Sequence, residues 1–312
     1  MKLVQSRTFK AMNPRQAGLT LVELMVALVV GLAVIVAALS TYLSSGSSSR
    51  INSQITQMSE DANAALSLLR THIAMAGYSH PIGLLATGEL SKAYSGPAIF
   101  GCQNGLDQAS TGQYLGGPNG TTLTCNSGNP STAETLIVLY EVDSSNSIPT
   151  KTSPGTDCLG NGALQINDSA GNPYYYLAEN RFFLDPSSGS LSCLGNGNTS
   201  PQPVVDNIAD FSVLYGVAGT DKSSGLPLKV AQQYLTASQV GDMAAGKWNQ
   251  VVSVRVCVVV RSEDDALDAP MASYTDCHGQ QQTPTTWGTP AKPDRRSYRR
   301  FTSTVALKNR IS

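Results

Sequence analysis

A single carboxylate, that of Glu23, lies near the start of an apolar run that extends to Leu43. The run contains no Lys, Arg or His that could neutralise this charge. An acid at the centre of a bilayer costs about 2.5–3.5 kcal/mol, and a buried charge is tolerated when an opposite charge pairs with it. The sequence therefore predicts that Glu23 forms an ion pair with a group outside the run.

Six cysteines could form disulfides or bind a metal. An even number of cysteines in an exported segment favours disulfides. The sequence contains no CxxC pair and has 3 His, so we expect no metal site. Many pairings are open, and among them we expect the sequential one. It joins Cys102 to Cys125, Cys158 to Cys193, and Cys257 to Cys277.

Other reactive side chains have simpler structural interpretations. His72 and His80 could act as ligands or bases, but capping or solvated histidines are far more common. The acidic segment Glu263–Asp268 lacks the spacing of a calcium loop and is interpreted as a solvated loop. The tyrosines Tyr174–Tyr176 could bind carbohydrate, although alternate tyrosines on a half-buried strand explain them better.

Enzyme signatures are absent from the sequence: it has no GxSxG, HExxH, GxxxxGK[ST] or GxGxxG. Residues Gly241–Lys247 have the spacing of a phosphate loop, but Trp248 occupies the position of the metal-binding hydroxyl. We therefore expect neither an enzyme nor a cofactor. The net charge of −1 argues against a general nucleic-acid binder.

A long helix should position Glu23. The apolar run of about 25 residues would be about 37 Å long, enough to cross a bilayer core of about 30 Å. Beyond it, apolar residues recur at helical spacing, and this second half should pack on a sheet. Gly46 and the serines around it would loosen the helix, and Gly77 would cap its end. The second stripe comprises Ile51, Ile55, Met58, Ala62, Leu66, Leu69 and Ile73.

Strand patterns dominate the rest of the chain. The clearest is the alternation of valines from Val252 to Val260, which predicts a strand with Cys257 on its more polar face. Asp185–Ser190 has turn chemistry and predicts a hairpin. The expected strands are 135–142, 174–184, 191–193, one within 203–216 that ends at Gly216, 251–261 and 300–308. A short helix is expected within 235–245, and loops with one or two short strands over 79–130.

The residues around Gly18 resemble a known signal. Gly18 followed by Leu19-Thr20-Leu21-Val22-Glu23 is similar to the type III signal of type IV pilins and of the pseudopilins of type II secretion. The resemblance implies that a prepilin peptidase cuts after Gly18 and that Leu19 is N-methylated. It also implies that Glu23 pairs with the amine of a neighbouring subunit's first residue. The family usually has Phe or Met at the position of Leu19. An ordinary secretory signal is disfavoured by the acid and by the length of the run.

Two further segments resemble the PilW-type minor pilins. Leu69–Tyr78 is similar to the end of their long helix, and the strands 251–261 and 300–308 are similar to their last hairpin. The resemblance implies an α+β fold in which a long N-terminal pilin helix packs on a mainly antiparallel β-sheet domain with long disulfide-pinned loops. The implied parts are a leader 1–18, a transmembrane or filament-core half-helix 19–45, an amphipathic half-helix 46–76 and a periplasmic β-rich domain 77–312.

The resemblance implies a minor pilin that takes part in initiating pilus assembly in the inner membrane and enters the pilus at or near its tip. The expected partners are the prepilin peptidase, other minor pilins, the major pilin and, before assembly, inner-membrane lipid. The basic leader would stay cytoplasmic, placing the C-terminal domain in the periplasm and later on the cell surface. A minor pseudopilin of type II secretion and a pilus-tip adhesin remain alternatives. The leader's basic residues are Lys2, Arg7, Lys10 and Arg15.

Overall fold

The computed structural model divides the chain into two compact units, residues 1–51 and 52–312. All but the last residue of the predicted leader, Gly18, lie outside the described part of the chain. The structure describes residues 18–84, 90–107, 114, 122–127, 134–167, 173–221, 223, 227–243, 247–265, 267, 271–284 and 294–311.

The first element, α1, is a helix of 55 residues, Leu21–Met75. It continues without a break through Gly46 and the neighbouring serines, so the predicted loosening at this point is wrong. A glycine inside a helix costs about 1 kcal/mol relative to alanine, and serine costs less, so neither needs to interrupt a helix with good formers on both sides.

Gly77 ends α1 as predicted. Its φ of 71° lies in the left-handed region that favours glycine. The N–H of Tyr78 donates to the carbonyl of Met75 at 2.8 Å, and the N–H of Gly77 donates to Leu139 at 2.8 Å. A Cβ at Gly77 would also lie 2.8 Å from the Cβ of Ala98, so this turn has room only for glycine.

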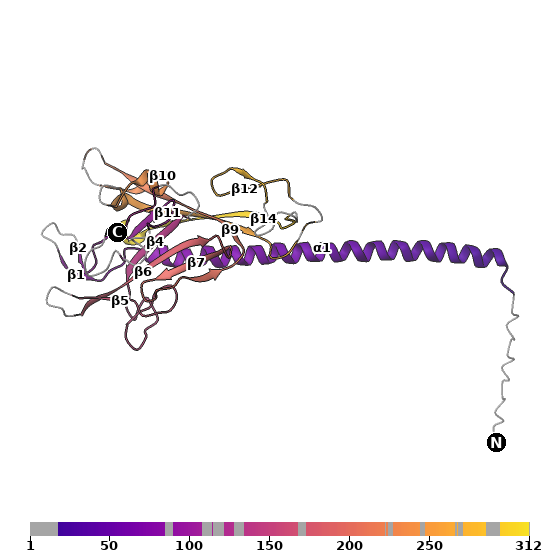
Figure 1. The fold of residues 1–312 in the computed structure, drawn as a ribbon, viewed down its shortest axis with the longest axis horizontal. Helices are drawn as coiled ribbons and strands as arrows, with labels where there is room; N and C mark the ends of the chain where they lie inside the picture. The colour runs from indigo at the N-terminus through magenta and orange to yellow at the C-terminus, as the bar shows by residue number, and fades with distance from the viewer. Residues whose placement is uncertain are drawn as a thin grey trace, which may run out of the picture. The chain divides into compact units, whose positions relative to one another are not determined.

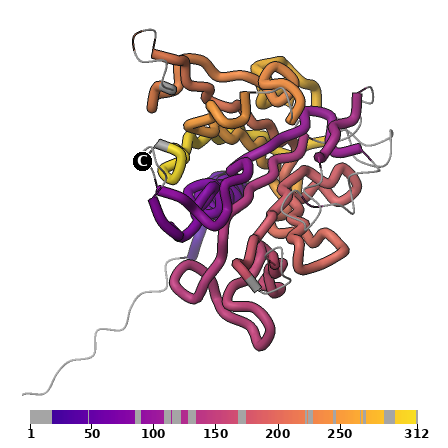
Figure 2. Tube along the Cα trace, turned by 90° about the vertical axis from the view of Figure 1, so that its left-hand side faces the viewer, coloured from indigo at the N-terminus to yellow at the C-terminus, as the bar shows by residue number. Residues whose placement is uncertain are grey.

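Two antiparallel sheets form most of the second unit (Figures 1 and 2). Among the described residues, one sheet has the strand order β3-β4-β6-β7-β8, with β5 paired to β6, and the other has the order β10-β9-β11-β14. The first comprises β3 (Ile99–Cys102), β4 (Thr135–Glu141), β5 (Leu164–Asn167), β6 (Pro173–Asp185), β7 (Ser190–Gly195) and β8 (Gln202–Val205). The second comprises β9 (Ile208–Thr220), β10 (Pro227–Leu235), β11 (Val251–Arg261) and β14 (Tyr298–Ala306).

Small elements complete the unit. β1 pairs with β2 and β12 pairs with β13, each as a separate two-stranded sheet. The short helix α2 begins after its N-cap residue, Thr236. These elements are β1 (Pro81–Leu84), β2 (Leu90–Lys92), β12 (Tyr274–Thr275), β13 (Gln281–Gln282), α2 (Ala237–Val240), a 3-10 turn (Trp248–Gln250) and α3 (Lys308–Ile311).

The second half of α1 contributes to the core shared by both sheets. The buried stripe differs from the predicted one in three places: Ile51 is only partly buried, Ile55 is 40% exposed, and Ala65 replaces Leu66 as the fully buried residue. The predicted α+β fold, with its helix on antiparallel sheets, is confirmed. The buried helix residues are Met58, Ala62, Ala65, Leu69, His72 and Ile73, and Ala76 just after the helix is also buried.

Each predicted strand corresponds to a strand of the structure, but the structure also contains strands that were not predicted. The valine strand, β11, lies between β9 and β14, and its Val258 faces Phe211 on one side and Phe301 on the other. β9 continues past the predicted end at Gly216, and β5, β10, β12 and β13 were not predicted. β3 is a short strand of the kind expected within 79–130, although its position there was not predicted.

Candidate functional site

The chain before α1 leaves the predicted cleavage site open. Gly18, Leu19 and Thr20 lie outside the helix and are exposed. Among the described residues, no atom lies within 4 Å of the position that a Cβ at Gly18 would occupy. The bond between Gly18 and Leu19 is therefore accessible to a peptidase.

Thr20 and Glu23 form a capping box in the first turn of α1. The backbone N–H and the hydroxyl of Thr20 both donate to Glu23 Oε2, each at 3.0 Å. In return, the backbone N–H of Glu23 donates to Thr20 Oγ1 at 3.2 Å. These bonds satisfy N–H groups that a helix start leaves without partners. The Thr-x-x-Glu spacing is the sequence signal from which this motif could have been predicted.

The other carboxylate oxygen of Glu23 is available. Oε1 accepts no hydrogen bond from the residues that the structure describes, whereas Oε2 accepts two. The side chain is exposed. A cation can therefore approach Oε1 without opening the capping box, so the geometry fits the predicted ion pair.

The helix around Glu23 is apolar on every face. Within α1, an 18-residue window has a mean hydropathy of 2.8, and none of that window is buried by the rest of the chain. By length and composition, α1 can cross a membrane. A helix that is hydrophobic all round requires apolar surroundings such as lipid or other helices. Its exposed apolar side chains are Leu21, Val22, Leu24, Met25, Val26, Leu28, Val29, Val30, Leu32, Val34, Ile35, Val36, Leu39, Tyr42 and Leu43.

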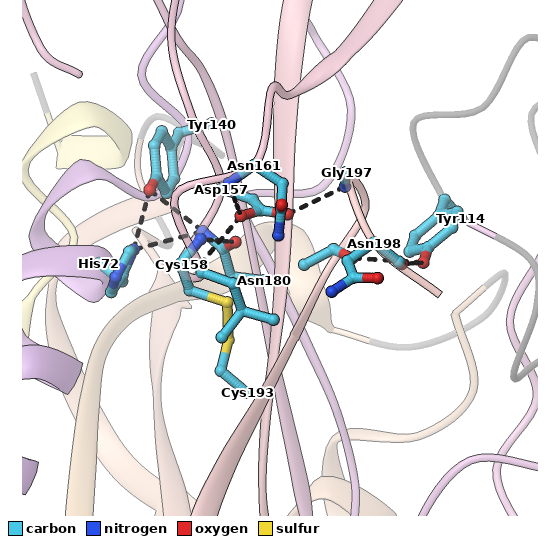
Figure 3. Close-up of a disulfide and its surroundings, with 12 residues drawn as sticks. His72, Tyr114, Tyr140, Asp157, Cys158, Asn161, Asn180, Cys193, Gly197 and Asn198 are labelled. Atoms are coloured by element: carbon cyan, nitrogen blue, oxygen red, sulfur yellow. Dashed lines mark hydrogen bonds between the residues drawn. A yellow bond between two sulfur atoms is a disulfide. The ribbon is translucent and has the colours of Figure 1, made fainter. Parts of the chain in front are cut away.

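The second half of α1 carries a buried polar contact to the first sheet (Figure 3). His72 Nδ1 lies 2.8 Å from the hydroxyl of Tyr140 and 3.3 Å from Asn180 Nδ2, which also donates to Tyr140 at 3.1 Å. The Asn180 amide is oriented by its Oδ1, which accepts the N–H of Cys158 at 2.8 Å. His72 Nδ1 therefore faces two donors and acts as an acceptor.

This environment keeps His72 neutral. Burial lowers the pKa of its imidazole to about 4, because the charged form would lose its hydration. Burial likewise raises the pKa of Tyr140. His72 is buried, so the interpretation as a capping or solvated histidine is wrong for this residue. It joins α1 to β4 and β6.

The structure pairs the six cysteines in sequential order: Cys102–Cys125, Cys158–Cys193 and Cys257–Cys277. Each bond fastens a loop to a strand. Cys193 on β7 holds the loop of Cys158, where Asp157 caps the turn by accepting the N–H groups of Leu159 and Gly197 at 2.9 and 3.0 Å (Figure 3).

The remaining sequence candidates have structural contacts. His80 pairs with Glu141, whose other oxygen accepts the hydroxyl of Ser79 at 2.6 Å. Tyr176 donates to Gln165 at 2.9 Å, and Tyr174 is 44% exposed. Glu263 accepts a hydrogen bond from Gln57 at 2.8 Å, whereas Asp268 lies outside the described residues.

The basic C-terminal residues lie on or beside the edge strand β14. Arg299 and Arg300 are exposed there, consistent with charge protecting a sheet edge. The basic residues of this region are Arg295, Arg296, Arg299, Arg300, Lys308 and Arg310, with Lys292 outside the described part.

The chain is similar to two protein families. Residues 174–309 match the family described as Type IV Pilus-assembly protein W, and residues 13–39 match the prokaryotic N-terminal methylation motif. The second match contains both Gly18 and Glu23. A search of curated proteins gave no match. A solved structure, the Type IV-like pilin TTHA1219 from Thermus thermophilus, is 11% identical over 81% of this chain and 98% of that chain, with a TM-score of 0.37.

Proposed function

We propose that this chain, a type IV minor pilin of the PilW type, takes part in initiating pilus assembly in the inner membrane and then enters the pilus at or near its tip. The observation that carries the proposal is that Glu23 Oε1 accepts no hydrogen bond from the described residues and lies on a helix that is apolar on every face. No partner within the run can neutralise this oxygen, so the partner belongs to another chain.

The cation is the amine that cleavage creates. Cutting between Gly18 and Leu19 gives each processed subunit a charged N-terminus at the head of its own apolar helix. When two such helices lie side by side with a small axial offset, the amine of one can approach Glu23 of the other. Because both groups are costly in a low dielectric when unpaired, the ion pair fixes the axial register of the helices.

The apolar surface of α1 limits the subunit to surroundings that keep this surface out of water. In the inner membrane, lipid covers the side chains between Leu21 and Leu43. Leaving the membrane would expose these side chains to water, at a free-energy cost of about 25 cal/mol per Å² of apolar surface. Extraction therefore requires other apolar helices to replace the lipid. Other minor pilins and the major pilin supply helices of this kind. The protein therefore acts as a structural component and not as an enzyme.

Processing and location follow from the same residues. We propose that prepilin peptidase cuts after Gly18 and that Leu19 becomes N-methylated. The basic leader stays in the cytoplasm, and residues 77–312 face the periplasm, where an oxidising environment suits the three disulfides.

Processing is tested by N-terminal sequencing of the protein from membranes. The mature chain should begin at methylated Leu19. The Gly18→Glu variant should keep the mass of the precursor on a gel, because a large charged side chain replaces the residue at the cut. A mature chain that starts elsewhere, or a Gly18→Glu variant of mature size, would refute the assigned site.

Assembly is tested with the Glu23→Gln variant in a strain that lacks the native gene. This change keeps the side-chain size but removes the charge, so the protein should reach the inner membrane normally while the number of pili per cell falls. Glu60→Gln is the matched control, because Glu60 is an exposed glutamate on the same helix outside the apolar run. Normal piliation with Glu23→Gln would contradict the ion pair.

The same strains separate a pilus from a type II secretion system. Loss of pili with normal release of secreted proteins supports the minor pilin. Loss of secretion with normal pili would assign the chain to a pseudopilus instead. Immunogold labelling of sheared pili tests the tip position, since label distributed along the shaft would contradict it.

A further inference from the structure

A loop and a strand of the second unit bring potential metal ligands together, far from Glu23 in the sequence. Asp210 and Ser212 lie on β9, and Asp276 and His278 lie between β12 and β13. One donor atom from each of Asp210, Asp276 and His278 lies within 4.8 Å of the other two. We propose that these three side chains bind a divalent transition-metal cation such as Zn²⁺ or Mn²⁺.

The fold fixes these ligands through a disulfide. In the sheet, Ser212 is the register partner of Cys257 and Asp210 is the partner of Val259. Cys257 is bonded to Cys277, the residue that separates Asp276 from His278. The disulfide therefore holds both loop ligands over the strand that carries Asp210, and binding would require little ordering of the chain.

Hydrogen bonds orient the two carboxylates. Asp276 Oδ1 accepts the N–H groups of His278 and Gln280 at 2.9 and 2.7 Å, and Oδ2 accepts Gln282 Nε2 at 2.8 Å. Asp210 Oδ2 accepts the N–H of Cys277 at 2.8 Å. An ionised carboxylate offers about four acceptor sites, so lone pairs remain for a cation. Such outer contacts are typical of metal ligands.

The charge balance of the cluster favours a cation. Among the described residues, neither Asp210 nor Asp276 forms an ion pair with a lysine or arginine. The basic side chain that reaches this loop, Arg300, donates to the carbonyl of Asp276 at 3.2 Å rather than to its carboxylate.

The donor set indicates the class of metal. An imidazole with two carboxylates suits Zn²⁺ or Mn²⁺, whereas Ca²⁺ takes six to eight oxygens. Ligands bonded at about 2.1 Å in tetrahedral geometry lie about 3.4 Å apart, so separations of up to 4.8 Å would have to close by up to about 1.4 Å on binding. The hydroxyl of Ser212, 3.5 Å from His278 Nε2, lies beside the site. His278 is exposed, so an ion can enter from solvent.

The proposal is tested by calorimetric titration of ZnCl₂ into the full-length chain, purified in detergent with intact disulfides and freed of metal by a chelator. One ion should bind per chain. His278→Gln and Asp210→Asn should each weaken binding at least about 10-fold, because each removes one of three ligands. His80→Gln is the matched control: His80 also lies against a carboxylate, that of Glu141, and its loss should leave the affinity unchanged.

Several results would overturn the site. These are no saturable Zn²⁺ binding by the native chain, unchanged affinity in His278→Gln, or an equal loss in His80→Gln. Calcium that displaces Zn²⁺ at equal concentration would overturn the assigned class of metal. His278 is exposed, so His278→Gln should fold. If Asp210→Asn fails to form the Cys257–Cys277 bond, the Zn²⁺ affinity of His278→Gln alone tests the site.

Discussion

Acid should weaken the attachment of α1 to the first sheet through His72. Its pKa is about 4 in the folded chain, against 6.5 for an unperturbed histidine. Above pH 6.5 the ring is neutral in both states and has no effect on the pH dependence. As the pH falls toward 4, His72 binds a proton in the unfolded chain but stays neutral in the folded chain. The difference of about 2.5 pKa units corresponds to about 3 kcal/mol of lost stability, of which about 2 kcal/mol is lost by pH 5.

A second buried group, Glu134, has the opposite effect on the pH dependence of stability. Burial raises the pKa of Glu134 to about 8, so the folded chain binds its proton more tightly than the unfolded chain. This stabilises the fold as the pH falls from 8, and a single stability curve would mix the two effects. The contribution of His72 is therefore measured as the difference between the native chain and His72→Gln, which accepts from Tyr140 but cannot ionise in this range.

The assay is urea unfolding of the full-length chain in detergent with intact disulfides, followed by the fluorescence of the buried Trp248. At pH 7.5 His72→Gln should be less stable than the native chain, because the imidazole packs against Phe182 with ring centroids 5.2 Å apart. By pH 5 the native chain should have lost about 2 kcal/mol relative to the variant. His278→Gln, at an exposed position, should follow the native curve. A constant difference between the native chain and His72→Gln from pH 7.5 to 5 would refute the reasoning.

Three further outcomes are expected. Gly77→Ala should destabilise the second unit by about 2–3 kcal/mol in urea unfolding, because it adds a clash with Ala98 to the strain of a positive φ. Gly160→Ala, with φ of 79° and no neighbour within 4 Å, should lose only about 1 kcal/mol; equal losses would show that the contact is irrelevant. Glu134→Gln should be more stable than the native chain above pH 8, where the buried carboxyl must ionise, and the same assay at pH 9 checks this. Thr20→Val should remove the capping box at a cost of about 1 kcal/mol and speed amide exchange in the first turn of α1, whereas unchanged exchange would show that the box does not hold it.

Patterns with a strong local period were predictable from the sequence. The valines of β11 and the apolar run of α1 repeat at strand and helix spacing over many residues, so neither needed tertiary information. β3 has only four residues and includes Gly101, which lies against the hydroxyl of Tyr215, and its strand state comes from pairing with β4. Gly46 was misjudged because a helix with strong formers on both sides tolerates one glycine.

The candidate sites were predictable only where their residues are close in sequence. Gly18, Leu19 and Glu23 lie within one short motif, and the capping box follows from Thr20 by a known spacing. Asp210 and His278 meet only because β9 pairs with β11 and a disulfide folds the loop back. No periodicity or local motif in the sequence indicates that these two residues lie close together in the fold.

The order of the disulfides has a consequence for how the chain matures. Each bond closes over a short stretch, with sequence separations of 23, 35 and 20 residues. If the chain is exported from its N-terminus, both cysteines of each native pair reach the oxidising compartment before the first cysteine of the next pair. Oxidation of consecutive cysteines then forms the native disulfides. The native cross-links can then be made in a single pass, without an isomerase to correct misplaced ones.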